Sequence, residues 1–488
     1  MSIDPKQPIP LYYQLKTLLL EEILSGRYGP ENRLPTEHEL CEQYAISRTP
    51  VSRALSELAE EGVILRQRRR GTFVNPHWLR RRPEQPEVRV VVSEGPWGEL
   101  IADAGSDEIQ VNLVTVPLPS LHQALTHAVA EGRAPDLAIV DSVWIPEFAV
   151  DGFLLALEDL DGAWLAHEHD DDFLDPLVKA NRYDGRTFGV SPFANVAGLW
   201  YRRRVLESLG LPPPRTWTEL RAVARAAQGK GFPHPIVMTG GSKGGETTAY
   251  CLIAFLASNG AEVLGPAGVT LDSRATAQAL RFLRSLVDDG LMSRDVLGYD
   301  WTKPVRLLGE GKAAISFGGS YEARALAEAL DVPLDELWEQ VGFIPVPGGP
   351  DGTPASVAGT MSYAIFRQAA QPALAMRLLQ RAVDSEELAR VARTTGRIPA
   401  RRSAVALAAP NPPFLSQTVT MLERAAIRPA TPLYPRVSAQ LQAMLEASLT
   451  GRLGAAAAAR RTAELIGAIT GLPVLHEADV VPPAAAAG

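Results

Sequence analysis

Basic and hydroxyl side chains gather around an expected helix start near the N-terminus. The apolar residues of this stretch recur at helical spacing, which leaves the polar ones on the opposite face. Arginine at a helix start reaches guanine edges in the major groove of DNA, and hydroxyl groups reach phosphates. The outward-facing residues with this chemistry are Ser47, Arg48, Thr49, Ser52 and Arg53. Their pattern is typical of a helix that reads double-stranded DNA.

A hairpin with a basic tip is expected to follow that helix. The run from Val63 to Val74 has the apolar ends of a two-stranded hairpin. Its tip carries Arg68, Arg69, Arg70 and Gly71. We interpret this hairpin as a basic wing beside the DNA-reading helix.

Three helices must position these groups. The first has an apolar face made by Leu11, Leu15, Leu18, Leu19 and Ile23, and it stops at the breaker run 25–30. Thr36 starts the second helix as an N-cap, with Glu39 at the capping-box position. A tight turn at Ala45-Ile46 then leads to the third helix, which Ser47 caps.

Short sequence signatures in this region occur in a recognisable order. They are Leu34-Pro35-Thr36-Glu37, Ser47-Arg48-Thr49-Pro50-Val51 and Gly71-Thr72-Phe73-Val74. The first 76 residues therefore resemble the GntR family of bacterial transcription regulators, whose winged helix-turn-helix binds operator DNA. The resemblance implies DNA contacts from His38, Ser47, Arg48, Thr49, Arg70 and Gly71. Ser52 stands where many members have Arg, with Arg53 next to it. A trihelix used only for protein contacts is the alternative, but it does not require a basic wing.

The charge distribution agrees with a DNA-binding head. The whole chain of 488 residues has a net charge of −8. Residues 1–82 nevertheless hold 13 Lys and Arg against 10 Asp and Glu, whereas the remainder holds 35 against 46. We therefore expect phosphate contacts to be confined to the N-terminal end.

The length and composition predict several folding units. A chain of 488 residues with 46% hydrophobic residues is too long for one small core. We expect a head at 1–76, a charged and proline-marked linker at 77–87, a larger domain at 88–475 and a disordered tail at 476–488. Arg80, Arg81 and Arg82 in the linker are a solvated charge run or additional phosphate contacts.

The cellular location is expected to be the cytoplasm. No export signal and no long uncharged apolar run are visible, so we expect no membrane association. Cys41 and Cys251 lie far apart and are interpreted as reduced thiols rather than a disulfide or a metal pair.

Short β-rich runs alternate with helical segments beyond residue 88, which indicates an α/β architecture. The expected strands are 88–92, 109–116, 137–140, 188–190, 198–201, 236–238, 313–317 and 363–366. The expected helices include 120–131, 217–228, 273–289 and 373–383.

Several strings in this region resemble the extracellular sugar-binding proteins of ABC transporters. They lie at 134–141, 149–155, 183–190, 199–220, 309–321 and 395–401, in the order in which that family has them. The resemblance implies a two-lobed α/β fold of the periplasmic-binding-protein type II, like maltose-binding protein, whose lobes close on a ligand by hinge motion. With a DNA-binding head attached, such a domain is expected to act as a sensor.

Sugar sites combine flat apolar rings with planar polar groups. By position in the family pattern, the ligand-binding candidates are Trp97, Asp141, Trp144, Glu246, Tyr250, Tyr321, Thr360 and Tyr434. Tyr201 and Trp217 are expected to belong to the core instead.

Other constellations favour no catalytic or metal chemistry. The glycine-rich run 240–245 lacks the Gly-Lys-Ser/Thr order of a phosphate-binding loop. The run His167–Asp172 is interpreted as a solvated loop rather than a metal site, because adjacent residues do not easily converge on one ion. We expect no enzyme activity, no cofactor and no metal.

The favoured function is a ligand-responsive transcription regulator, a homodimeric repressor whose operator affinity changes when a carbohydrate binds. The alternatives are a sensor for a non-sugar solute, a ligand-independent regulator with a vestigial pair of lobes, and an aminotransferase-type fusion. The last alternative needs a cofactor-linking lysine, for which Lys243 is the candidate.

Overall fold

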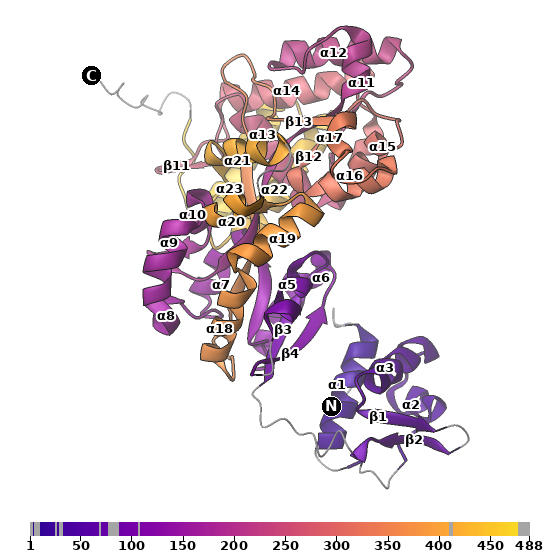
Figure 1. Cartoon of the computed structure of the whole chain (residues 1–488). Coiled ribbons are helices and arrows are strands. Elements are labelled where there is room, and N and C mark those ends of the chain that lie inside the picture. Colours follow the sequence, from indigo (N-terminus) through magenta and orange to yellow (C-terminus); the bar gives the residue numbers. More distant parts are fainter. Residues whose placement is uncertain are drawn as a thin grey trace. The chain divides into compact units, whose positions relative to one another are not determined.

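The N-terminal head combines helices with one hairpin (Figure 1). Its elements are α1 (Leu11–Leu24), α2 (Glu37–Tyr44), α3 (Arg48–Glu60), β1 (Ile64–Gln67) and β2 (Gly71–Val74). The structure is a computed structural model that describes residues 3, 10–24, 27–28, 33–67, 70–76, 87–105, 108–408 and 413–476. Arg68, Arg69, the linker arginines 80–82 and the tail from residue 477 lie outside the described residues.

Local capping and apolar spacing explain the helices of the head. The Thr36 hydroxyl accepts the Glu39 amide at 3.3 Å, and the Glu39 carboxylate accepts the Thr36 amide at 2.6 Å, so the predicted capping box is confirmed. Ala45 ends α2 in the left-handed conformation, with φ of 52°. Leucines of α1 and the apolar face of α3 then form a small core, which includes Leu15, Leu19, Val51, Leu55 and Leu58.

The described residues group into two compact units. One holds Met1–Ala138 with Gln368–Leu378, and the other holds Ile139–Arg367 with Leu379–Gly488. We call them the first unit and the second unit. The first therefore contains the head.

A parallel sheet organises the rest of the first unit. β3 (Glu87–Val92) pairs in parallel with β4 (Gln110–Thr115) and with the start of β5 (Leu137–Asp141). Helices α5 (Trp97–Ala104) and α6 (Leu118–Ala130) connect these strands. The buried Asp136 carboxylate accepts the backbone amides of Arg89 at 2.8 Å and of Ala370 at 2.6 Å, which secures the return segment at 368–378.

One long strand, β8 (Val190–Arg202), organises the second unit. Its first part pairs with β14 (Val357–Ile365) and β15 (Ile398–Pro399), and its second part pairs with β12 (Ile315–Gly319) and β13 (Val341–Ile344). Beyond these lie β9 (Ile236–Val237), parallel to β12, and β16 (Ala426–Ile427), parallel to β14.

The expectation of two separate strands at 188–190 and 198–201 is wrong. Both runs are covered by or adjoin β8, which is buried along nearly its whole length. Because both faces of this strand are covered, its sequence shows no alternation of apolar and polar residues. Pro192 and Gly198 lie inside the strand and do not interrupt it.

Helices cover the sheet of the second unit. They are α7 (Ile145–Val150), α8 (Glu158–Trp164), α9 (Asp170–Asp172), α10 (Asp175–Ala180), α11 (Arg203–Leu209), α12 (Trp217–Gly229), α13 (Glu246–Ala257), α14 (Arg274–Asp288), α15 (Lys303–Gly309), α16 (Ala323–Leu330), α17 (Leu337–Gln340), α19 (Ser385–Thr395), α20 (Arg402–Ala408), α21 (Pro413–Glu423), α22 (Tyr434–Thr450) and α23 (Ala455–Thr470). Helix α18 (Pro372–Ala382) crosses from the first unit into the second.

Short elements complete the second unit. They are the helical turns η1 (Ser142–Trp144), η2 (Leu165–His169), η3 (Ser242–Gly244), η4 (Arg294–Gly298) and η5 (Ser320–Glu322), and the strand pairs β6 (Arg182–Tyr183) with β7 (Arg186–Thr187) and β10 (Leu264–Gly265) with β11 (Gly268–Val269).

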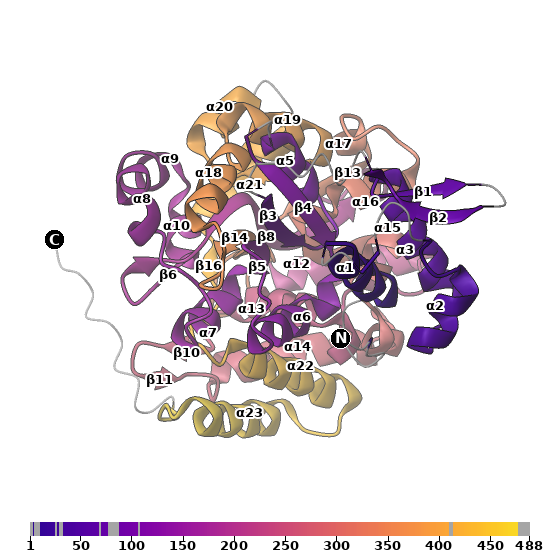
Figure 2. The same cartoon turned by 90° about the horizontal axis from the view of Figure 1, so that it is seen from below.

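The core of the second unit surrounds α13. Helices α14, α22 and α23 lie side by side (Figure 2). Tyr201 and Trp217 are each 5% exposed, so their predicted place in the core is confirmed. Within the described part of the chain, no helix is both long and apolar enough to cross a membrane.

The run His167–Asp172 is helical rather than the loop that the sequence suggested, although His167, Glu168, Asp170 and Asp171 are exposed as expected. It lies in η2 and α9, and His169 is fully buried against Phe173, with ring centroids 4.7 Å apart. Burial lowers the pKa of His169. The described residues contain no group of His, Cys, Asp and Glu that could hold a metal ion.

Candidate functional site

The start of α3 presents the predicted DNA-binding side chains to solvent. Ser47 stands before the helix with extended backbone and makes no side-chain cap. The Arg48 side chain is 83% exposed, that of Arg53 is 61% exposed and that of His38 on α2 is 82% exposed. Thr49 is exposed and Ser52 is half-buried. Apolar packing of the opposite face of α3 is what leaves these groups outside.

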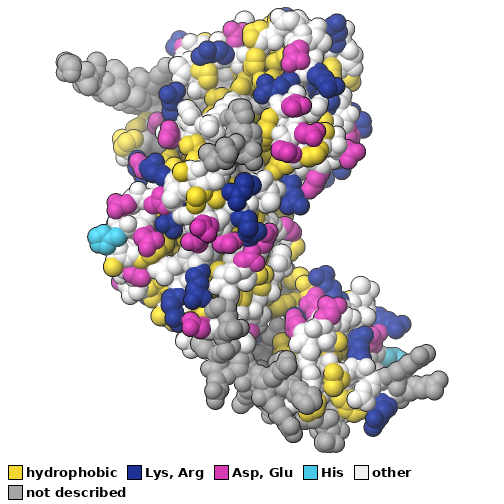
Figure 3. All heavy atoms as spheres, viewed as in Figure 1, with side chains coloured by type: hydrophobic (Ala, Val, Ile, Leu, Met, Phe, Trp, Pro, Cys, Tyr) yellow, Lys and Arg dark blue, Asp and Glu magenta, His cyan; other side chains and the backbone are white. Residues whose placement is uncertain are grey.

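Acidic neighbours pair with the exposed arginines of the head. Arg48 Nε donates to Glu37 Oε2 at 2.9 Å, and Arg66 Nη2 donates to Glu37 Oε1 at 3.4 Å. Arg53 donates to Glu57 at 3.1 Å and lies 3.8 Å above the Tyr12 ring. Figure 3 shows Lys and Arg side chains mixed with Asp and Glu on the visible face of the head. Exposed ion pairs of this kind are weak, so DNA phosphates can compete for the arginines.

The base of the wing requires glycine at one position. Gly71 opposes Gln67 in the hairpin and has φ of +115°, which L side chains rarely adopt. A Cβ at this position would lie 2.7 Å from Arg33 Cδ. Arg70 precedes Gly71 and is exposed.

A charged cluster in the second unit joins three segments that are distant in sequence. Asp141 ends β5, Glu246 begins α13 and Arg428 follows β16. Arg428 donates from Nη2 to Asp141 Oδ1 at 2.8 Å and from Nη1 to Asp141 Oδ2 at 3.3 Å. Its Nη1 also donates to Glu246 Oε1 at 2.9 Å. One guanidinium thus neutralises two carboxylates in part.

Hydroxyl groups complete the hydrogen bonding of Glu246. The Tyr434 hydroxyl donates to Oε1 at 2.7 Å, and the Ser438 hydroxyl donates to Oε2 at 2.6 Å. Both donors lie on the first turns of α22 and are buried. Each oxygen of Glu246 therefore has a donor from within the protein.

The electrostatics of this cluster reflect crowding by protein atoms. Burial raises the pKa of Glu246, Arg428 opposes that shift and Asp141 adds to it. The Glu246 side chain is still 32% exposed, so solvent reaches it although protein surrounds it. Burial lowers the pKa of Arg428, but Asp141 and Glu246 outweigh that effect and the pKa is raised. Arg428 therefore stays positively charged.

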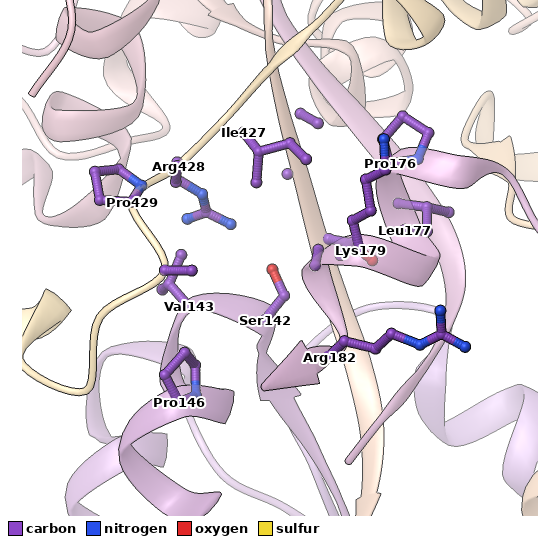
Figure 4. Close-up of a pocket in the computed structure, with 15 residues that line it drawn as sticks. Ser142, Val143, Pro146, Pro176, Leu177, Lys179, Arg182, Ile427, Arg428 and Pro429 are labelled. Carbon is purple, nitrogen blue, oxygen red and sulfur yellow. The ribbon is translucent and has the colours of Figure 1, made fainter. Parts of the chain in front are cut away.

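A small cavity adjoins Arg428 (Figure 4). Its volume is about 40 Å³, and its lining includes Ser142, Ile427 and Thr360. The side chains of Ser142 and Arg428 point into it, whereas Arg182 points away. The space holds a few water molecules but not a sugar ring.

Two further predicted ligand residues, Tyr250 and Thr360, lie next to this cluster or its cavity. The Tyr250 hydroxyl donates to the Val357 carbonyl at 2.9 Å, and Arg428 lies 5.5 Å from the centre of the Tyr250 ring. Thr360 lines the cavity and donates to the Phe193 carbonyl at 2.7 Å.

The predicted aromatic residues divide between exposed and buried surroundings. Tyr321 forms a 3.4 Å hydroxyl contact with Thr247, and its ring centroid lies 6.4 Å from that of Trp301, which is 41% exposed. Trp144 is half-buried beside Phe148. Trp97 belongs to the first unit, where it starts α5. It is 2% exposed, as a residue that packs in the core is.

Sequence reasoning missed three residues of this region. Arg428 and Ser438 bind the predicted carboxylates, and Trp301 lies beside Tyr321. The sequence does hold a signal for Arg428: it is the single charged residue in the run 425–435. A lone arginine among prolines and apolar residues is the type of residue that needs a buried partner.

Family comparisons match two parts of the chain. The family profile of bacterial extracellular solute-binding proteins matches residues 84–386. The profile of bacterial regulatory proteins of the gntR family matches residues 11–74.

Individual relatives divide in the same way. A putative binding protein of Brucella abortus strain 2308 is 26% identical over 329 residues, which cover 65% of this chain and 76% of that protein. The HTH-type transcriptional repressor NagR of Bacillus subtilis strain 168 is 45% identical over 75 residues, which cover 15% of this chain and 31% of the repressor.

Solved structures share the fold of the larger part. The GacH receptor of Streptomyces glaucescens, solved unliganded and with acarbose, aligns with a TM-score of 0.71 and 18% identity over 79% of this chain and 99% of its own. Maltose-bound MalE3 of T. maritima aligns with a TM-score of 0.70 and 24% identity, covering 78% of this chain and 99% of its own. These likenesses establish a fold like that of maltose-binding protein.

Proposed function

The chain belongs to the bacterial extracellular solute-binding protein family and carries a gntR-family regulatory head. On this basis we propose that it is a transcription regulator whose affinity for operator DNA depends on a bound carbohydrate. The observation that carries the proposal is the presence, in one chain, of a helix start with exposed DNA-binding chemistry and a solute-binding fold with a polar cluster around Glu246. The protein acts by binding, without catalysis, in the cytoplasm where operator DNA lies.

A carbohydrate is the solute class that the chemistry of the cluster favours. Carboxylates such as Asp141 and Glu246 accept sugar hydroxyls, and the rings of Tyr321 and Trp301 offer flat apolar surfaces. Relatives of the same fold were solved with acarbose and with maltose. The proposed ligand residues are the seven predicted from sequence that lie in the second unit, joined by Arg428, Ser438 and Trp301. The eighth, Trp97, is buried in the first unit and is left out.

Regulation follows from linkage between the two binding events. We propose a homodimer in which two α3 helices enter successive major grooves of an inverted repeat. The solute binds the DNA-competent and the DNA-incompetent state of the protein with different free energies. The free energy of operator binding changes by that difference, which is typically about 1–3 kcal/mol. Repression that the solute relieves is the proposed direction.

The proposed domain boundaries keep the head at 1–76, the linker at 77–87, the solute-binding domain at 88–475 and the tail at 476–488. The two family matches, at 11–74 and 84–386, support a division near residue 80.

A ligand-independent regulator is the second candidate. The observation in its favour is the cavity of about 40 Å³ beside Arg428, together with the internal hydrogen bonds that occupy Glu246. In that case the solute-binding fold serves assembly alone.

A thermal-shift screen separates these candidates. Purified protein is tested with monosaccharides and oligosaccharides, and with amino acids, polyamines and phosphorylated sugars as comparison compounds. A ligand at about a hundred times its Kd stabilises the protein by about 2.7 kcal/mol, which is a measurable shift. A saccharide that also changes operator affinity in a fluorescence anisotropy titration supports the proposal. Shifts only with the comparison compounds exclude the carbohydrate, and no shift with any compound favours the ligand-independent regulator.

A further inference from the structure

The guanidinium of Arg428 is buried and hydrogen-bonded on several sides, as a bound guanidinium ligand would be. Its side chain is 5% exposed and reaches Asp141 with two hydrogen bonds and Glu246 with a third. These carboxylates come from the end of a strand and the start of a helix that are far apart in the sequence. The Tyr250 ring lies 5.5 Å from the guanidinium, which adds an aromatic face to the surroundings. The guanidinium is thus held on several sides.

We propose that Asp141 and Glu246 form a guanidinium-binding site that Arg428 occupies as an internal ligand, and that this occupation makes Arg428 a specificity-determining residue. With Arg428 in place, the site rejects cationic solutes and accepts uncharged ones. The specificity part of this inference rests on the proposed solute-binding function, whereas the guanidinium site itself does not.

Charge balance explains why an uncharged solute does not replace Arg428. Removing the guanidinium leaves the carboxylates of Asp141 and Glu246 without a counter-ion. Only hydrogen bonds from Tyr434, Ser438 and the Val143 amide then offset their mutual repulsion. An uncharged solute that displaced Arg428 would leave the same unpaired charges. A cationic solute would have to compete with a guanidinium that is covalently attached and therefore present at high effective concentration. The wild-type site consequently binds uncharged solutes beside Arg428.

Shape complementarity points to guanidinium rather than to any cation. The guanidinium is planar, and its N–H groups form a fork that matches carboxylate oxygens. Arg428 uses this fork on Asp141 and still reaches Glu246 from the same Nη1. The compact ammonium of lysine lacks the fork, so Lys at position 428 does not reproduce these contacts. A small guanidinium compound can reproduce them when it enters the space that the Arg428 side chain leaves in R428A.

Chemical rescue tests the guanidinium site. The melting midpoint of the full chain is measured for wild type, R428A, R428K and R436A while methylguanidinium chloride is raised through the millimolar range, with sodium chloride as the salt comparison. R436A is the matched control, because Arg436 is an exposed residue on α22 near the cluster. We expect methylguanidinium to raise the midpoint of R428A alone. Equal responses of R428A and R436A would overturn the site.

A neutralised variant keeps the test decisive if R428A folds poorly. D141N/E246Q/R428A lacks the repelling charges, so we expect it to fold and to be insensitive to methylguanidinium. If R428A yields folded protein only when prepared with methylguanidinium, the site is supported. If R428A fails to fold with and without the compound while the neutralised variant folds, or if both respond alike, the site is rejected.

The specificity part has its own readout. A saccharide that stabilises wild type is compared with its amino-substituted analogue on wild type and R428A. We expect wild type to prefer the uncharged compound and R428A to shift toward the amine, and an unchanged preference would overturn this part. Absence of any saccharide response would contradict the proposed function and leave the rescue result standing by itself.

Discussion

Arg428 and Asp141 lie 287 positions apart in the sequence and form a two-pronged ion pair, with N–O distances of 2.8 and 3.3 Å. The same guanidinium reaches Glu246 at 2.9 Å. The segment after β16 is therefore tied both to the end of β5 and to the start of α13. Displacement of any of these segments by a bound solute must change the environment of the other two.

Breaking this ion pair is expected to destabilise the protein. The substitution R428M leaves Asp141 and Glu246 without their counter-ion, and loss of one partner from a buried ion pair costs about 3–5 kcal/mol. Because Glu246 is 32% exposed, solvent screens part of this cost and we expect about 2 kcal/mol. Urea unfolding of the full chain measures the change. The variant D141N/E246Q/R428M removes all the charges and is expected to recover most of the loss; a variant as unstable as R428M would contradict the charge argument.

Glu322 is expected to make stability fall as the pH rises. Its side chain accepts Trp200 Nε1 and the Gly319 amide, each at 3.1 Å, and burial raises its pKa from 4.5 to about 8. A raised pKa means that the folded protein holds this proton more tightly than the unfolded chain does. Its contribution is therefore complete below about pH 4.5 and is lost as the pH rises through about 8.

Melting midpoints between pH 5 and pH 9 test this contribution, with E322Q and the exposed E336Q compared with wild type. The amide of E322Q retains a hydrogen-bond acceptor without a titrating proton. We expect the melting midpoint of E322Q to rise relative to that of wild type as the pH rises, while the midpoint of E336Q follows the wild-type curve. Parallel curves for wild type and E322Q would show that Glu322 titrates near its ordinary pKa.

Arg48 is expected to contribute to operator recognition. Loss of an arginine contact to a base edge typically costs about 1–3 kcal/mol, so R48A should weaken operator binding by that amount. The substitution E37Q should have the opposite effect, because Glu37 binds both Arg48 and Arg66 in the free protein. Anisotropy titrations with DNA obtained by in vitro selection measure both changes. R436A is the control, and equal affinities of R48A and R436A would exclude the contact.

Arg70 is expected to bind the phosphate backbone rather than a base. R70A should therefore weaken binding to all DNA sequences by a similar factor and reduce the slope of log affinity against log salt by about 1. The measurement is a set of titrations at increasing salt on selected and scrambled DNA. A loss restricted to the selected sequence would instead assign Arg70 to base recognition.

Gly71 is expected to tolerate no side chain. G71A combines a φ of +115° with a Cβ that would lie 2.7 Å from Arg33 Cδ, so either the Arg33 side chain or the base of the wing must shift. We expect a loss of about 1 kcal/mol or more in the stability of the head together with weaker DNA binding. G62A is the matched control, because Gly62 has φ of +71° and nothing within 4 Å of the added Cβ. Urea unfolding and DNA titration compare the two variants. Equal effects of G71A and G62A would contradict the added cost of the φ of +115° and of the Arg33 contact.

The elements of the head were predictable because their signals are local. The capping pair of Thr36 and Glu39 spans one helical turn, and the apolar face of α3 repeats at helical spacing. The strand at 88–92 and the helix at 217–228 also carry their own patterns. For the same reason Tyr201 and Trp217 were recognised as core residues.

Longer elements and buried polar groups were predicted less well. β8 was divided into two strands because burial on both faces removes the alternation that marks a strand. The burial of His169 against Phe173 was missed because a run of charged residues surrounds it in the sequence. In both cases the deciding contacts come from other parts of the chain.

The candidate solute site shows the same division. Residue types and family spacing pointed to Asp141, Glu246 and Tyr434. The tertiary structure joined them through Arg428, which the sequence analysis missed although it is the single charged residue of the run 425–435. By itself the sequence determined the local elements, the DNA-binding head and the kind of fold that follows it, since helix caps and apolar periodicity act over a few residues. Only the tertiary structure decided which charges meet, because the pairing of residues 141, 246 and 428 depends on chain crossings that bring distant segments together and remove them from water.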